Sequence, residues 1–300
     1  MPIFKIENNK FKALKSESFK SELELQTLVD NNLKEIFGLE FLRTEFGGQG
    51  LSIDTIAYDS ETKGPVLIEY KKDSHESVID QGMAYLSWLL NHKGDYQIVL
   101  ESKIVKKEID WSQARVIFIA RSFNTHQTNA LGFKGVPFEL WKYDWSNDIF
   151  QIQQIETPKS DISISSILKT KPVKEVSREI QEYTIADHLS RVSGNVKTLF
   201  EEMHERIINL DSRIQAKPVK NYIGYKVQYH NFCSLNLSKE KIRVYVRSTK
   251  IDDPKKIFKK VPANYKWGTT ALWYHDFVNN ANADYIMSVI KQGYDNAPDR

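Results

Sequence analysis

The residues best suited to chemistry lie in one stretch, Ser52 to Lys72, which reads SIDTIAYDSETKGPVLIEYKK. Asp54 lies in its first apolar segment, and Glu69 and Lys71 lie at the end of its second. Side chains of a strand alternate between its faces, so Glu69 and Lys71 project to one side and Tyr70 to the other. A buried charge is costly unless it is paired, and an acid beside an amine in so apolar a strand therefore indicates a functional site.

The stretch predicts a β-hairpin, because two segments rich in Ile, Val, Leu and Tyr flank a turn at Asp59 to Pro65. Asp54 would then bring a second carboxylate to the edge that carries Glu69. Two carboxylates beside a lysine suit a hard cation, and oxygen ligands favour Mg²⁺ or Mn²⁺ over Zn²⁺. Cys-based zinc sites and intramolecular disulfides are excluded, since Cys233 is the single cysteine.

This stretch resembles the signature of the PD-(D/E)xK nucleases, with Asp54 followed by Glu69-Tyr70-Lys71. Two flanking matches extend the resemblance: Glu22 in the upstream segment ELELQ, and Gln81-Gly-Met-Ala-Tyr85, which looks like the Gln-x3-Tyr motif of RecB-like nucleases. The proline of the family name is absent, because Ile53 precedes Asp54. The resemblance implies an α/β fold with a restriction endonuclease-like mixed central sheet flanked by helices.

The resemblance also implies the roles of these residues. Asp54, Glu69 and the carbonyl of Tyr70 would hold Mg²⁺ or Mn²⁺, and Lys71 would position the attacking water or stabilise the developing charge. Lys72 points to the opposite face by strand parity.

Three supporting residues have structural alternatives. Glu22 would orient the helix side of the site or touch a second metal, with Glu24 as the fallback, whereas carboxylates in a first helical turn also serve as caps. Gln81 and Tyr85 would support catalysis by pointing at the metal-site lysine or at DNA. The alternative is a surface glutamine that caps a core tyrosine.

Hydrophobic periodicity predicts the elements around this hairpin. We expect a hairpin at Pro2 to Leu14 that packs at an edge, an irregular loop at Phe46 to Gly50, helices at Ser18 to Phe37 and Ser74 to Asn91, and strands at Tyr96 to Leu100, Arg115 to Ala120 (an interior strand) and Phe138 to Tyr143.

A polar loop follows the buried strand RVIFIA, at the kind of place where open α/β sheets bind ligands. We expect four of its residues to contact phosphates or bases: Arg121, Asn124, His126 and Gln127. His126 as a zinc ligand has little support, because no second His or Cys lies at ligand spacing.

Composition predicts two domains joined by a linker. The segment from Thr157 to about Glu182 is rich in Ser, Lys and Pro, so we expect a nuclease-like domain at 1–157, a linker at 158–182 and a smaller α+β domain at 183–300. Charge is uneven: through Ser160 the chain has 19 Lys and Arg against 23 Asp and Glu, and the remainder has 23 against 16. A basic second domain is suited to gripping phosphate backbones.

In this second domain the pattern predicts one long helix from Thr184 to Leu210, strands at Gly224 to His230, Phe232 to Leu237 and Lys241 to Arg247, and a final helix near Ala283 to Gln292. The segments NFCSLNL, KIRVYVR and Lys266-Trp267-Gly268 resemble a small bacterial domain that carries the name "predicted transport protein", over about residues 184 to 296. The expected phosphate-binding face consists of Lys255, Lys256, Lys259 and Lys260 together with Arg243 and Arg247, and Trp267 and Trp273 are stacking candidates.

We therefore expect a metal-dependent nuclease that acts on nucleic acid, most simply DNA, with a role in bacterial defence or restriction suggested by analogy. The alternatives are a non-catalytic nucleic-acid or protein-binding module on a nuclease scaffold, and an enzyme directed at RNA. The single cysteine and the lack of a long apolar segment favour a cytoplasmic protein without membrane contact. A homodimer is left open.

Overall fold

The computed structural model describes residues 3–48, 50–71, 78–104, 107–157, 160–262 and 272–297. The chain forms two compact units, Met1–Glu182 and Tyr183–Arg300. The predicted Lys72, the start of the predicted helix at Ser74, and Lys266-Trp267-Gly268 lie outside the described residues. None of the helices that the structure describes is long and apolar enough to cross a membrane.

The first unit is built on a six-stranded mixed sheet, whose strand order is β3-β4-β5-β6-β7-β8. Its strands are β3 (Glu40–Gly48), β4 (Leu51–Tyr58), β5 (Pro65–Lys71), β6 (Arg115–Ala120), β7 (Phe138–Ser146) and β8 (Ile149–Ile155). The pairs β5/β6 and β6/β7 are parallel, and the others are antiparallel. The predicted central hairpin (β4/β5) and the predicted interior strand (β6) are both confirmed.

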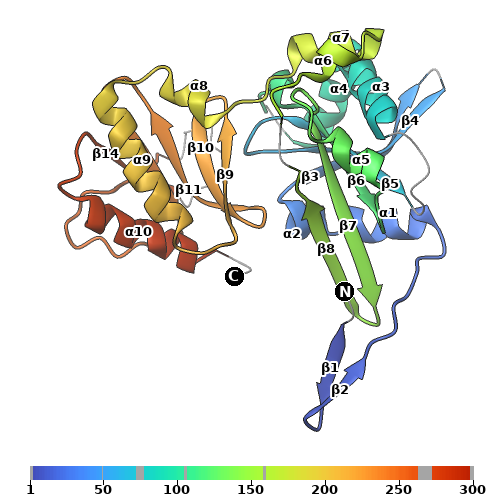
Figure 1. Cartoon of the computed structure of the whole chain (residues 1–300), viewed down its shortest axis with the longest axis horizontal. Helices are drawn as coiled ribbons and strands as arrows, with labels where there is room; N and C mark the ends of the chain where they lie inside the picture. The colour runs from blue at the N-terminus through green and yellow to red at the C-terminus, as the bar shows by residue number, and fades with distance from the viewer. Residues whose placement is uncertain are drawn as a thin grey trace. The chain divides into compact units, whose positions relative to one another are not determined.

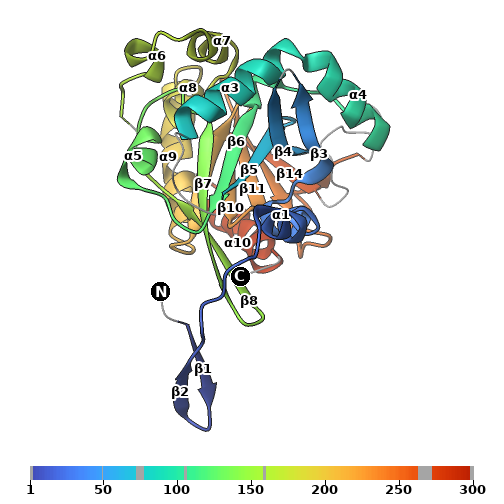
Figure 2. The same ribbon diagram turned by 90° about the vertical axis from the view of Figure 1, so that its right-hand side faces the viewer.

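Helices cover both faces of this sheet (Figures 1 and 2). On one face, α1 (Glu22–Asp30) and α2 (Leu33–Phe37) pack Leu25, Val29 and Leu33 against the sheet. On the other face lie α3 (Val78–Asn91) and α4 (Lys93–Lys103), which bury residues such as Leu86 and Leu100. The remaining helical pieces of this unit are η1 (Trp111–Gln113), α5 (Thr125–Ala130), α6 (Ile164–Ile167) and α7 (Lys171–Glu179). The predicted class, a mixed central sheet flanked by helices, is confirmed.

Three local predictions for this unit are wrong. Tyr96 to Leu100 lies in helix α4, because Tyr96 and Leu100 are buried one turn apart while Ile98 between them is 69% exposed. The predicted loop at Phe46 is the end of β3, which pairs with β4 in a hairpin. The predicted helix at Ser18 to Phe37 is two helices, since α1 ends at Asp30 and α2 begins at Leu33.

The described part of the predicted linker, residues 160–182, is not a linker, because α7 packs on α3 within the first unit. Val173 and Val176 are buried in the core that α3 and α4 share. Glu175 accepts hydrogen bonds from the side chains of Ser87 and Asn91, both on α3. The second unit begins at Tyr183, immediately after this segment.

The amino-terminal strands β1 (Phe4–Glu7) and β2 (Lys10–Ala13) form a two-stranded sheet of their own and do not join a sheet edge. In the paired register Phe4 and Ile6 of β1 lie opposite Ala13 and Phe11 of β2. Phe4, Ile6 and Phe11 are all exposed, and Figure 1 shows this ribbon projecting from the end of the β7/β8 hairpin. An isolated ribbon of this size adds little stability in water.

We therefore expect that deleting residues 1–14 changes the free energy of unfolding by no more than about 0.5 kcal/mol, the range of surface changes. Urea unfolding followed by circular dichroism measures this. A loss of several kcal/mol would show that the ribbon packs on the body of the protein.

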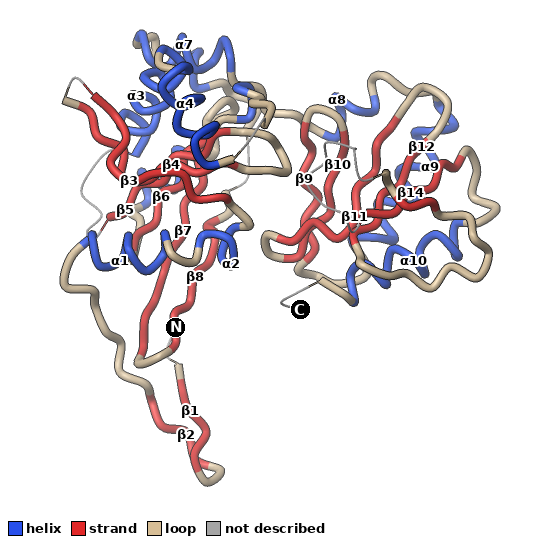
Figure 3. Tube along the Cα trace, turned by 180° about the vertical axis from the view of Figure 1, so that it is seen from behind, coloured by secondary structure: helices blue, strands red, loops and turns tan. Residues whose placement is uncertain are grey.

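The second unit has an antiparallel sheet of its own, with strand order β13-β14-β12-β11-β10-β9 (Figure 3). Its strands are β9 (Ile214–Val219), β10 (Tyr222–Val227), β11 (His230–Leu237), β12 (Ile242–Arg247), β13 (Lys259–Lys260) and β14 (Leu272–Phe277), and its helices are α8 (Ile185–Leu189), α9 (Gly194–Ile208) and α10 (Ala283–Asp295). Helices α9 and α10 share one apolar core with the sheet. This unit is the smaller α+β domain that the sequence predicts.

The predicted long helix from Thr184 is two helices, α8 and α9. Helix α8 ends at Leu189, and Ser193 then caps α9 by accepting a hydrogen bond from the N–H of Val196 at 3.4 Å. The apolar stripe continues across the break, because Leu189 and Val192 still pack against the core that contains Val196.

Candidate active site

Asp54 and Glu69 come together at the end of the β4/β5 hairpin. The two strands are antiparallel, with Thr55 opposite Ile68. Asp54, the residue before Thr55, therefore lies near the end of β5, close to Glu69. Oδ2 of Asp54 accepts a hydrogen bond from the backbone N–H of Tyr70 at 2.9 Å. The carboxylate of Asp54 is therefore held against the strand that carries Glu69.

Glu69 is the centre of a polar cluster on the face of the sheet that α3 covers. Its carboxylate is buried, with 4% of the residue exposed. Oε1 of Glu69 lies 3.0 Å from Nζ of Lys71 and accepts a hydrogen bond from Nε2 of Gln81 at 2.7 Å. Nε2 of Gln81 also lies 2.8 Å from the hydroxyl of Tyr85, one turn along α3. The structure thus brings Asp54, Glu69, Lys71, Gln81 and Tyr85 together, and Gln81 contacts the acid instead of the lysine.

A second polar network, which the sequence analysis missed, fixes the hairpin from its other face. The hydroxyl of Tyr70 donates to Oδ1 of Asp30 at 2.7 Å, and Thr55 donates to the same carboxylate at 2.9 Å. Gln26 donates from Nε2 to the backbone carbonyl of Asp54 at 2.7 Å. Gln26 and Asp30 lie one turn apart on the buried side of α1, and polar residues on an otherwise apolar helical face are the signal that could have found them.

Glu22 enters the electrostatics of the site from the first turn of α1. Its charge is one of the influences that raise the pKa of Asp54, together with burial, which is the largest. The capping alternative belongs to its neighbour: Glu24 accepts a hydrogen bond from the N–H of Lys20 at 2.7 Å, and the N–H of Glu24 donates to Ser21 at 3.2 Å. Glu22 therefore stays a candidate for the site, and Glu24 is engaged at the start of the helix, where Ser21 is the N-cap.

The two central carboxylates are hard to ionise together. Burial and then the charge of Asp54 raise the pKa of Glu69 to about 7, against the opposing influence of Lys71. Burial raises the pKa of Asp54 too. Two neighbouring carboxylates in a buried site repel each other when both are ionised. A bound cation would stabilise the doubly ionised form.

Burial raises the pKa of Glu69 in the folded state above 4.5, the ordinary pKa of a glutamate. The folded protein therefore binds more protons than the unfolded chain between pH 4.5 and about pH 7. The contribution of Glu69 to the free energy of unfolding is fully present below pH 4.5 and is lost as the pH rises through 7. Without divalent metal, we expect the unfolding free energy of the wild type, relative to Glu69→Gln, to fall by roughly 3 kcal/mol over this window. Urea titrations in EDTA at several pH values measure it, and parallel pH profiles for the two proteins would contradict it.

The donor set fits a hard divalent cation. Among the described residues, no hydrogen-bond donor meets Oε2 of the buried Glu69, so this oxygen is available as a ligand. No group of three or more His, Cys, Asp or Glu in the described parts of the chain is placed to hold a metal. A cation here would therefore be held by two carboxylates, with backbone, water or substrate oxygens completing its shell, which suits Mg²⁺.

The residues predicted to contact nucleic acid after β6 are engaged locally. Asn124 and Gln127 form a reciprocal capping box at the start of α5: Asn124 accepts from the N–H of Gln127 at 2.9 Å, and Gln127 accepts from the N–H of Asn124 at 2.8 Å. The guanidinium of Arg121 donates to the hydroxyls of Ser16, at 2.6 Å, and Ser18. His126 is exposed. Asn124 and Gln127 thus have a structural explanation, and His126 and Arg121 stay predictions as contacts to nucleic acid.

The four predicted lysines of the second unit are all exposed. The ammonium of Lys255 lies 4.7 Å from the ring centre of Tyr285, and that of Lys260 lies 6.0 Å from the ring centre of Trp273. Lys259 and Lys260 form the short strand β13, and Lys256 has a positive φ of 53° in the preceding turn. Their role in binding phosphates stays a prediction.

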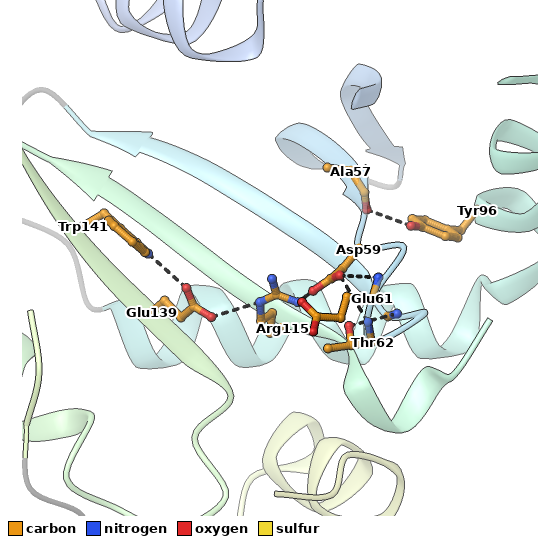
Figure 4. A network of polar contacts seen from close by, with 9 residues as sticks. Ala57, Asp59, Glu61, Thr62, Tyr96, Arg115, Glu139 and Trp141 are labelled. Carbon is orange, nitrogen blue, oxygen red and sulfur yellow. Dashed lines mark hydrogen bonds and ion pairs between the residues drawn. The ribbon is translucent and has the colours of Figure 1, made fainter. Parts of the chain in front are cut away.

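A buried ion network braces the end of the sheet opposite the carboxylates (Figure 4). Arg115, the first residue of β6, lies 3.0 Å from the carboxylate of Asp59 in the β4/β5 turn and 3.0 Å from that of Glu139 on β7. Asp59 also accepts from the N–H groups of Glu61 and Thr62. One arginine on β6 thus joins the β4/β5 turn to β7.

Comparison with known proteins gives one relative along the whole chain. An uncharacterized protein of Haemophilus influenzae is 33% identical over 301 residues, which is 97% of this chain and 99% of the relative. Residues 185–297 match a domain of unknown function, DUF5655. The match begins two residues after Tyr183, the start of the second compact unit.

Three solved structures are similar to part of the chain. They are a repair endonuclease from Pyrococcus abyssi (18% identity, TM-score 0.25), EndoMS in a complex with double-stranded DNA (20%, 0.26) and EndoMS in its apo form (23%, 0.29). The similar part covers 41%, 44% and 42% of this chain, respectively. This chain covers 48%, 50% and 48% of those structures, about half of their length.

Proposed function

This chain belongs to one family with the Haemophilus influenzae protein, and from the site on its central hairpin we propose that it is a nuclease that uses Mg²⁺ or Mn²⁺ to hydrolyse phosphodiester bonds. The observation that carries the proposal is the buried Glu69, which has one oxygen beside Lys71 and Gln81 and the other oxygen without a hydrogen-bond donor from any residue that the structure describes. DNA is the proposed substrate, and bacterial defence or restriction is the proposed setting.

Asp54 and Glu69 would hold the metal, which supplies charge neutralisation and a more acidic bound water. The carbonyl of Tyr70 is the third oxygen that we propose. Lys71 lies 3.0 Å from Glu69, so its ammonium is placed to orient water and to stabilise negative charge that develops on phosphate oxygens. Gln81 and Tyr85 act on the orientation of Glu69, because Nε2 of Gln81 holds Oε1 and leaves Oε2 to the metal.

Purified full-length protein tests the proposal when it is incubated with plasmid, linear duplex, single-stranded DNA and RNA, each with Mg²⁺, with Mn²⁺ or with EDTA. We expect cleavage of DNA that requires the divalent ion. Cleavage of RNA alone would show the same chemistry with another substrate. A failure to cleave any substrate, together with no Mg²⁺ or Mn²⁺ binding by titration calorimetry, would instead support a binding module in which Glu69 and Lys71 form only an ion pair.

Lys71→Met removes the ammonium and keeps a side chain of similar length. We expect the rate of Mg²⁺-dependent cleavage to fall by about 100-fold, because negative charge that develops on the phosphate loses the ammonium group that stabilises it. The affinity for Mg²⁺ should not fall, because Lys71 repels the ion.

Lys63→Met is the matched control, since Lys63 lies in the turn of the same hairpin and pairs with Glu108 at 2.7 Å, away from the carboxylates of the site. Its rate should equal that of the wild type. Equal rates for Lys71→Met and Lys63→Met would remove Lys71 from the mechanism.

A further inference from the structure

The second unit contains a cavity of about 680 Å³, within the size range of small-molecule sites. It is lined by the start of β11, the end of β12 with the loop that follows it, and the last turns of α10. All of these residues belong to the second unit, so the cavity is separate from the hairpin of Asp54 and Glu69.

A β-bulge builds one wall of this cavity. Pairing between β10 and β11 shifts after Tyr225, so that Cys233 and Asn231 have partners on β10 and Phe232 between them has none. A bulge re-aims side chains, and here two consecutive residues, Asn231 and Phe232, both line the cavity. Asn231 is 5% exposed, and a buried amide of this kind is suited to fixing the orientation of a ligand.

Two glycines allow the surrounding elements to approach this wall. A Cβ at Gly224 on β10 would lie 3.0 Å from Nδ2 of Asn231. A Cβ at Gly293 on α10 would lie 2.9 Å from the carbonyl oxygen of Phe232 and 2.7 Å from Cγ1 of Val246. Any larger residue at either position would push the wall apart, so the shape of the cavity depends on these close contacts.

Positive charge predominates on the lining. Arg247, at the end of β12, and Lys250, in the next loop, supply two cations, against one carboxylate from Asp252. The last turns of the 13-residue helix α10 complete the lining. They are held against this loop, because the side-chain amide of Asn296 donates to the hydroxyl of Ser248 at 3.2 Å.

We propose that this cavity binds a nucleotide, with its phosphate at Arg247 and Lys250. A phosphate matches the two cations of the lining, and the volume admits a base and a sugar as well as a phosphate. The phosphate comes either from a free mononucleotide or from the end of a nucleic-acid strand.

Titration calorimetry of the full chain with AMP tests this, with adenosine as the ligand that lacks the phosphate. We expect AMP to bind and adenosine to bind at least about tenfold more weakly, as the loss of charge-assisted hydrogen bonds requires. Arg247→Gln and Lys250→Gln should each weaken AMP by about tenfold. Lys250 is exposed, so Lys250→Gln should fold normally. It therefore decides the test even if Arg247→Gln does not fold.

Lys197→Gln is the matched control, because Lys197 is exposed on α9 of the same unit and does not line the cavity. It should bind AMP as the wild type does. A 5′-phosphorylated single-stranded oligonucleotide identifies the source of the phosphate. If it binds more tightly than AMP and Lys250→Gln weakens it, the ligand is the end of a strand. If it binds more weakly than AMP, the ligand is a free nucleotide. The proposal is overturned if AMP does not bind at about 1 mM, or if Arg247→Gln and Lys250→Gln both bind AMP like the wild type.

Discussion

Glu69→Gln is expected to lower Mg²⁺-dependent cleavage by at least about 100-fold and to weaken the binding of Mg²⁺ by a similar factor. The substitution keeps the shape of a side chain that is almost fully buried, and it removes only the negative charge. A neutral amide oxygen is a poorer ligand for a hard cation than a carboxylate is. Initial rates on the preferred DNA substrate, and calorimetric titration with Mg²⁺, measure the two effects.

The fold should survive this substitution, because the variant no longer has to ionise a buried carboxyl group. Circular dichroism and the thermal midpoint check this. Glu101→Gln is the matched control: Glu101 lies on α4, is exposed and accepts a hydrogen bond from the side chain of Gln97 at 2.7 Å, so the activity of this variant should match the wild type. Normal cleavage by a folded Glu69→Gln protein would refute the assignment of the site.

Arg115→Ala is expected to destabilise the first unit by about 3–5 kcal/mol, the usual result of removing one partner from a buried ion network. Arg115 has 18% of its side chain exposed, and the carboxylates of Asp59 and Glu139 beside it are 8% and 14% exposed. Without the guanidinium, two nearby carboxylates would stay buried with too little positive charge. Urea unfolding at neutral pH measures the loss.

Arg178→Ala supplies the comparison for this result. Arg178 lies in the last turn of α7 and is exposed, so its removal should change the unfolding free energy by no more than about 0.5 kcal/mol. At acidic pH the difference in unfolding free energy between Arg115→Ala and the wild type should become smaller, because protonation of Asp59 and Glu139 removes the two unbalanced charges. Equal stability of Arg115→Ala and Arg178→Ala would show that the network does not brace the sheet.

The sequence alone determined the hairpin and its chemical content. Strand alternation placed Glu69 and Lys71 on one face and Tyr70 on the other, and the structure has Glu69 against Lys71 and Tyr70 against Asp30. The interior strand β6 was also predictable, since a continuous apolar run flanked by turn residues has few other uses. These features depend on residues that are neighbours in the chain.

Local sequence patterns gave wrong predictions where packing between residues distant in the chain decides the local structure. Tyr96 and Leu100 suit either a strand or a helix, and contacts with the β3/β4 side of the sheet select the helix. The composition of 158–182 resembles a linker, yet Val173 and Val176 find an apolar surface on α3 and order the segment.

Only the tertiary structure shows how the polar residues are shared among partners. Asn124 and Gln127 could have faced a ligand, but they cap α5. Asp30 and Gln26 carried no motif, but they hold Tyr70 and Asp54 in place. A buried polar group must find a partner wherever the folded chain brings one, and the identity of that partner is not written in the residues next to it.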